Sequence, residues 1–182
     1  TRGIKKGVLN SNISTRSVKK TYIHNYEYIK DAKHPKNHDN SCGYVAASLV
    51  LYYWHKTMHN GLVLPQYLDS NGELNSTDYY SPQTNLKDKL VQYNDGTAES
   101  WGKPVRDALR RYTTDNRVVS SSSYYIGKIN LVSELEKNRP VIIFGLLPKH
   151  PESNLLMHAV TAYGIEADWK GNIAGNFIVN YG

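Results

Sequence analysis

The stretch from Cys42 to Trp54, CGYVAASLVLYYW, is apolar on almost every side of the helix that it predicts. Apolar residues recur at helical spacing on two adjoining faces, Val45, Leu49 and Tyr52 on one and Ala46, Val50, Tyr53 and Trp54 on the other. A helix without a polar face is stable only when neighbouring elements cover it. We therefore expect this helix to be buried, capped at its start by Asp39, Asn40 or Ser41 and ended by Asn60-Gly61.

The remaining pattern places helices early and strands late. The segment 21–29 predicts a first strand, 86–93 and 103–112 predict helices, and 129–138 predicts a helix that Pro140 ends. Three apolar stretches then predict strands, VIIFGLL, LMHAVTAYGIE and NFIVNYG. This order predicts an α+β fold in which a C-terminal antiparallel sheet packs against the cysteine helix.

Composition excludes several classes of protein. The longest apolar run, 141–147, is far below the roughly 20 residues of a transmembrane helix, so no transmembrane segment is expected. The net charge of +6 comes from residues 1–39, which carry nine basic and three acidic residues, whereas the other 143 residues carry thirteen of each. A neutral body gives no basic groove, so we expect no nucleic-acid partner.

The first twenty residues differ from the rest of the chain in their charge composition. Residues 1–20 contain six basic and no acidic residues and show neither a helical nor a strand period. Such a segment buries too little apolar surface to fold alone, and we expect a basic flexible arm. It could instead be the remnant of a pro-segment, or it could make a weak electrostatic contact with an anionic cell envelope.

The chain has one cysteine, Cys42, at the start of the apolar helix. The free N–H groups of a helix N-terminus stabilise a thiolate, the reactive form of cysteine. His158 in MHAVTAYG and Asn180 in FIVNYG complete a possible set of nucleophile, base and orienter. The alternatives are a small core cysteine and a core histidine that bonds a backbone carbonyl. Asp168 is a rival orienter, although it lies in a segment that predicts an exposed turn.

Metal binding is not expected. His55 and His59 have a spacing that can hold zinc, but HKTMH lacks the glutamate of the metalloprotease pattern, and a single cysteine excludes a multi-cysteine zinc site. We interpret both histidines as solvated residues at a helix end. The predicted chemistry needs no cofactor.

Four blocks resemble the papain-like cysteine peptidase superfamily, in particular its bacterial branches around streptopain and the bacteriocin-leader peptidases. They are SCGYVAASLVLYYW, RPVIIFGLL, MHAVTAYGI and NFIVNYG, in the family's order. The resemblance implies a papain-like α+β domain over 21–182, with Cys42 as nucleophile, His158 as general base and Asn180 as orienter. This chain departs from the family at Lys36, where the family usually has a glutamine that helps to hold the oxyanion. Asn37 or Asn40 is therefore the candidate for that role.

The resemblance implies hydrolysis of peptide bonds in a peptide or protein substrate through a thioester, by a secreted or cell-surface protein whose leader is not present in this chain. Two alternatives remain open. The same three groups serve acyl transferases and amidases acting on cell-wall peptides. A binding module that keeps the fold with impaired catalysis is the other alternative.

Overall fold

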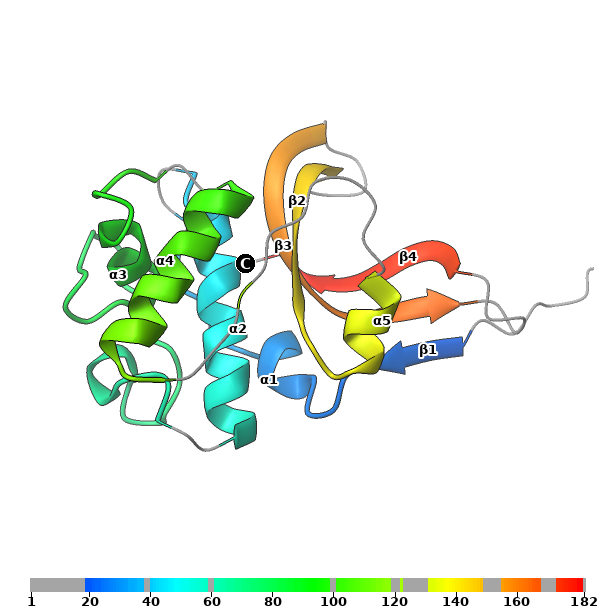
Figure 1. Ribbon diagram of the computed structural model, residues 1–182, viewed down its shortest axis with the longest axis horizontal. Helices are drawn as coiled ribbons and strands as arrows, with labels where there is room; N and C mark the ends of the chain where they lie inside the picture. The colour runs from blue at the N-terminus through cyan, green and yellow to red at the C-terminus, as the bar shows by residue number, and fades with distance from the viewer. Residues whose placement is uncertain are drawn as a thin grey trace, which may run out of the picture.

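The computed structural model describes residues 19–37, 40–58, 61–98, 101–118, 122, 131–148, 155–167 and 173–181. Its helices are α1 (Glu27–Lys30), α2 (Cys42–Met58), α3 (Leu86–Gln92), α4 (Gly102–Asp115) and α5 (Leu131–Glu136), with a 3-10 turn, η1, at Pro65–Tyr67. Its strands are β1 (Lys19–Tyr22), β2 (Val141–Pro148), β3 (Leu155–Ala167) and β4 (Ile173–Asn180). The predicted α+β class is confirmed: α3 and α4 lie on one side of α2, and an antiparallel sheet with α1 and α5 beside it lies on the other (Figure 1).

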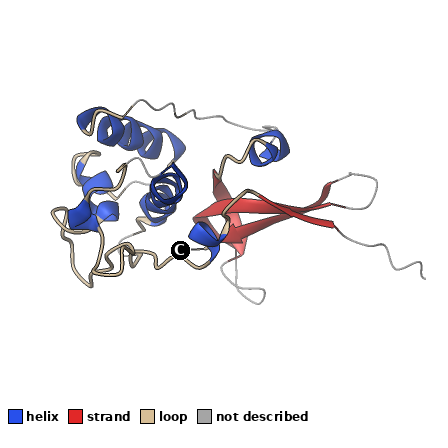
Figure 2. Ribbon diagram, turned by 90° about the horizontal axis from the view of Figure 1, so that it is seen from below, coloured by secondary structure: helices blue, strands red, loops and turns tan. Residues whose placement is uncertain are grey.

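The long strand β3 organises the sheet. Its first part, Leu155–Ala162, pairs with β2, and its second part pairs with both β1 and β4. Because Thr161 and Ala162 of β3 pair with β2 and β4 at once, those two strands lie on opposite edges of β3. Figure 2 shows this sheet as one layer beside the helices. The three C-terminal strands agree with the sequence prediction.

Two hydrophobic clusters explain why α2 needs no polar face. Leu49 and Tyr52 belong to the cluster on the side of α3 and α4, whereas Tyr53 belongs to the cluster under the sheet. Trp54 packs against both clusters. The helix therefore separates two cores, and its predicted burial is confirmed. Gly61, at φ +65°, follows it as the expected stop.

The first strand differs from the prediction over 21–29. β1 ends at Tyr22, and the chain turns at Asn25, whose φ is +54°, before α1 begins. Asparagine tolerates this left-handed conformation and starts turns, which explains why the tyrosine-rich stretch does not continue as a strand. Strand β1 also includes Lys19 and Lys20, which the sequence pattern assigns to the arm, and Lys20 pairs with Glu166 of β3 at 2.9 Å. Residues 1–18 lie outside the described residues.

Gly164 lies where β1 approaches β3 closely. A Cβ there would lie 2.9 Å from the Thr21 carbonyl oxygen and 2.9 Å from Cδ1 of Tyr22. We expect Gly164→Ala to lower the free energy of unfolding by about 1–3 kcal/mol, because β1 or β3 has to shift. Urea denaturation measures this loss.

Gly145→Ala on β2 is the matched control for this substitution, since no heavy atom in the described part of the chain lies within 4 Å of its Cβ position. Gly145→Ala should lower the free energy of unfolding clearly less than Gly164→Ala does. Equal losses of stability in the two variants would contradict the crowding of β1 against β3.

Candidate active site

Cys42 is the first residue of α2. The Ser41 carbonyl oxygen accepts the N–H groups of Tyr44 at 2.9 Å and Val45 at 3.1 Å, so the helix begins here as predicted. Asn40, at φ +61°, turns the chain into the helix, and its carbonyl oxygen lies 3.9 Å from the Cys42 Sγ. The cysteine is 9% exposed and belongs to the buried residues of the fold.

His158 lies on β3, opposite Gly145 of β2. Its Nε2 is 3.0 Å from the carbonyl oxygen of Tyr181, and the two rings stack with centroids 5.8 Å apart and planes 18° apart. A carbonyl oxygen only accepts hydrogen bonds, so Nε2 carries a proton in this contact. When the ring is neutral, Nδ1 then has a free lone pair and can accept a proton.

A direct bond joins the cysteine helix to the histidine strand. The buried hydroxyl of Thr161 on β3 donates to the carbonyl oxygen of Ala46 on α2 at 3.2 Å. Ala46 is about one helical turn after Cys42, and Thr161 is three residues after His158. The fold therefore brings the two elements that carry the predicted nucleophile and base into contact.

Asn180 is the last residue of β4 and pairs with Thr161 in the sheet. Its side-chain Nδ2 donates to the carbonyl oxygen of Ile29, in α1, at 2.7 Å. This bond ties the end of β4 to the N-terminal part of the fold. The predicted role of Asn180 as orienter of the imidazole stays a prediction, and the rival Asp168 lies outside the described residues.

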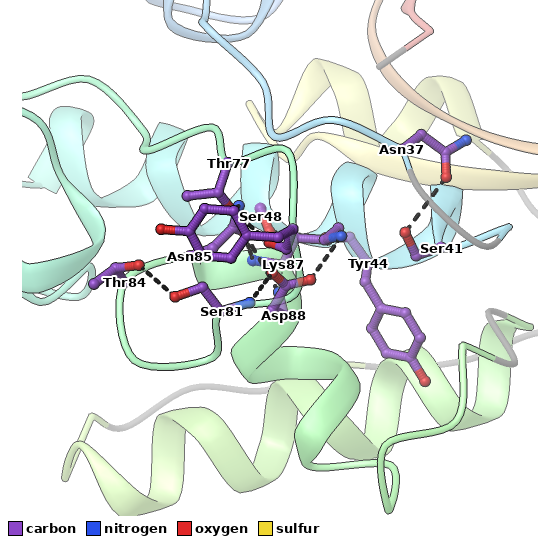
Figure 3. Close-up of polar contacts among 11 residues, drawn as sticks. Asn37, Ser41, Tyr44, Ser48, Thr77, Ser81, Thr84, Asn85, Lys87 and Asp88 are labelled. Atoms are coloured by element: carbon purple, nitrogen blue, oxygen red, sulfur yellow. Dashed lines mark hydrogen bonds and ion pairs between the residues drawn. The ribbon is translucent and has the colours of Figure 1, made fainter.

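The oxyanion candidates precede α2. Asn37 accepts the Ser41 hydroxyl through its Oδ1 at 3.4 Å, and Figure 3 shows its amide nitrogen pointing away from Ser41. Lys36 forms an ion pair with Asp78 in an exposed position. Asn37 thus places one side-chain amide beside Ser41, the residue before the cysteine helix.

A buried ion pair at the start of α3 has no counterpart in the sequence predictions. Lys87 Nζ lies 2.6 Å from Asp88 Oδ1, and the two side chains are 4% and 1% exposed (Figure 3). Asp88 Oδ2 accepts the N–H of Ser81 at 2.8 Å, and the side chain of Asn85 caps the helix. The sequence predicts the helix at 86–93 but gives no sign that these two charges are buried. The pair lies inside the helical part of the molecule, because α3 packs against α2.

The histidines at the end of α2 are not assembled as a metal site in the described part of the chain. His55 accepts the N–H of Val63 through Nδ1 at 3.3 Å, which gives that ring a structural contact, and His59 lies outside the described residues. Within the described ranges, no cluster of three or more His, Cys, Asp or Glu side chains is placed to hold a metal ion.

Tyr181 is the residue at this site that the sequence analysis missed. Its contact with His158 uses a backbone carbonyl, which leaves no mark on residue type; the signal available was only its place directly after Asn180.

Among the helices described, none combines the length and the apolar character needed to span a bilayer. Comparisons with protein-family models, with curated proteins and with solved structures found no match to this chain.

Proposed function

We propose that this chain is a cysteine peptidase of papain-like type, in which Cys42 is the nucleophile and His158 the general base. The observation that carries the proposal is the buried contact between α2, which begins at the only cysteine, and β3, which holds a histidine with its Nε2 already bonded. That arrangement leaves Nδ1 as the proton acceptor of the neutral ring.

The proposed reaction has two stages. The Cys42 thiol gives its proton to Nδ1 of His158, and Sγ forms a bond to the carbonyl carbon of the scissile peptide. The tetrahedral adduct expels the amine, which takes the proton from the imidazolium, and a thioester remains. His158 then removes a proton from water as the water oxygen adds to the thioester carbon. The tetrahedral adduct expels Cys42 Sγ, which takes the proton back from the imidazolium, and the carboxylic acid product departs.

We assign the oxyanion contacts to the backbone N–H of Cys42 and to Nδ2 of Asn37. Removing one oxyanion donor commonly costs about 10² to 10³ in rate. We expect Asn37→Ala to lower kcat about a hundredfold, measured by peptide hydrolysis under saturating substrate.

Lys36→Ala is the matched control for this prediction. It changes the neighbouring residue, at the position of the family's glutamine, but removes only an exposed ion pair. Its kcat should equal that of the parent. An unchanged kcat in Asn37→Ala would show that its amide is not an oxyanion donor.

Digestion of unfolded casein in water enriched in ¹⁸O tests the proposed function. Hydrolysis through a thioester puts one ¹⁸O atom into each newly formed carboxyl terminus, which mass spectrometry of the peptides detects. Peptides joined to an added amine, without ¹⁸O, would favour the acyl transferase. Intact casein after prolonged incubation would contradict peptidase activity.

A binding module of the same fold is the second candidate. The observation that favours it is the surface ion pair of Lys36 with Asp78, because it takes the usual glutamine position out of any catalytic role. This candidate predicts that casein-derived peptides bind without being cleaved.

A further inference from the structure

We infer that Tyr181 is the positioning residue for His158: its backbone carbonyl fixes the imidazole with the proton on Nε2, and its ring covers one face of the imidazole. The inference rests on the proposed function for its catalytic meaning. Its structural content, a fixed orientation and a fixed tautomer, stands on the described contacts alone.

The contact with Tyr181 restrains His158 in two independent ways. The Nε2–O distance of 3.0 Å is that of an ordinary hydrogen bond, and it fixes the rotation of the ring about its side-chain bond. The near-parallel stack, with planes 18° apart, restricts tilting of the same ring. Together they determine where Nδ1 points and that it has a free lone pair.

The carbonyl of Tyr181 is itself held in place. The preceding residue, Asn180, is anchored to α1 through its bond to the Ile29 carbonyl oxygen and to β3 through its pairing with Thr161. Thr161 in turn bonds to Ala46 of the cysteine helix. The group that orients the base therefore directly follows β4, which pairs with the strand that is bonded to α2.

A backbone acceptor suits a thiol nucleophile. A neutral carbonyl orients the ring and selects its tautomer without adding a formal negative charge, whereas a carboxylate at this place would also make the ring more basic. The side chain of residue 181 then contributes through its ring alone. Substitutions that keep the ring should therefore keep the orientation, and substitutions that remove the ring and loosen the backbone should lose it.

The experiment follows the imidazole directly by ¹⁵N NMR. In uniformly ¹⁵N-labelled protein, the His158 signals are assigned by their loss in His158→Gln, and the spectrum is recorded where the ring is neutral. We expect a protonated Nε2 with an observable, slowly exchanging N–H and an unprotonated Nδ1. Tyr181→Phe, which keeps the ring, should retain both features.

Tyr181→Gly removes the ring and frees the backbone. We expect it to lose the slowly exchanging Nε2–H signal and to lower kcat about 10-fold to 100-fold with KM unchanged, because the base is misplaced while substrate binding is not. Tyr181→Phe should keep the kcat of the parent.

Two results would overturn the inference. One is a parent spectrum with the proton on Nδ1. The other is a slowly exchanging Nε2–H that persists in Tyr181→Gly and disappears in Asn180→Ala, which would assign the ring contact to the Asn180 side chain. Failure of the proposed function is distinct from both: a parent that cleaves nothing, with the Nε2–H signal intact, would support the positioning contact and contradict the peptidase.

Discussion

Cys42→Ser is expected to abolish peptide hydrolysis, with a loss of about 10³-fold or more, while the protein still folds. Serine is close in size to cysteine, but its hydroxyl is far less acidic than a thiol, and a His158 that fits a thiol does not activate it to the same degree. Initial rates of casein hydrolysis measure the loss. Far-UV circular dichroism and the urea midpoint check that the fold is retained.

The matching variant is His158→Ala, for which we expect a comparable loss of the casein hydrolysis rate. Residues that act as one unit are strongly non-additive, so the double variant Cys42→Ser/His158→Ala should lose little more than either single variant. Losses that multiply in the double variant would show two independent effects rather than a pair. A Cys42→Ser protein that cleaves casein at the parental rate would remove the mechanism altogether.

Lys87→Met is expected to lower the free energy of unfolding by about 3–5 kcal/mol, because it leaves the Asp88 carboxylate buried without its cation. The two side chains are almost completely buried and 2.6 Å apart, so solvent does not screen the lost charge. Equilibrium denaturation by urea measures the change.

Lys103→Met on α4 is the control for the loss of an ion pair at the surface. Lys103 is 69% exposed and pairs with Asp107 at 3.1 Å, and such pairs contribute about 0–1 kcal/mol. Lys87→Met/Asp88→Asn should regain part of the stability, since the buried charge is gone and an acceptor for the Ser81 N–H remains. Equal effects of Lys87→Met and Lys103→Met would contradict the burial of the Lys87–Asp88 pair.

The parts of the fold that the sequence predicted are those with a strong hydrophobic pattern. Helix α2 and strands β2, β3 and β4 are apolar over most of their length, a pattern that favours elements packed against a core. Strand β1 was misplaced because the tyrosines of 21–29 favour a strand whether or not a turn at Asn25 interrupts it. A conformation set by one left-handed residue is hard to recognise in such a pattern.

At the candidate site, residue type indicated Cys42 and His158, and the structure adds the contact between the elements that carry them. Residue type could not indicate the role of the Tyr181 backbone carbonyl, since every residue has a backbone carbonyl. The buried Lys87–Asp88 pair was missed for a related reason: adjacent charges on a helix usually lie in solvent, and here the packing of α3 against α2 and α4 encloses them. Both features depend on tertiary contacts rather than on local pattern.

The most direct test of the central claim, that Cys42 and His158 act together, is the rate at which a peptidyl epoxide inhibitor labels the protein. Cys42 is the only cysteine, so intact mass reports a thiol adduct at one position. We predict a single adduct that forms about a hundredfold faster in the parent than in His158→Ala or in the inhibitor's reaction with glutathione, since in the proposed mechanism His158 takes the proton of the Cys42 thiol. Equal labelling rates in the parent and in His158→Ala would contradict the account.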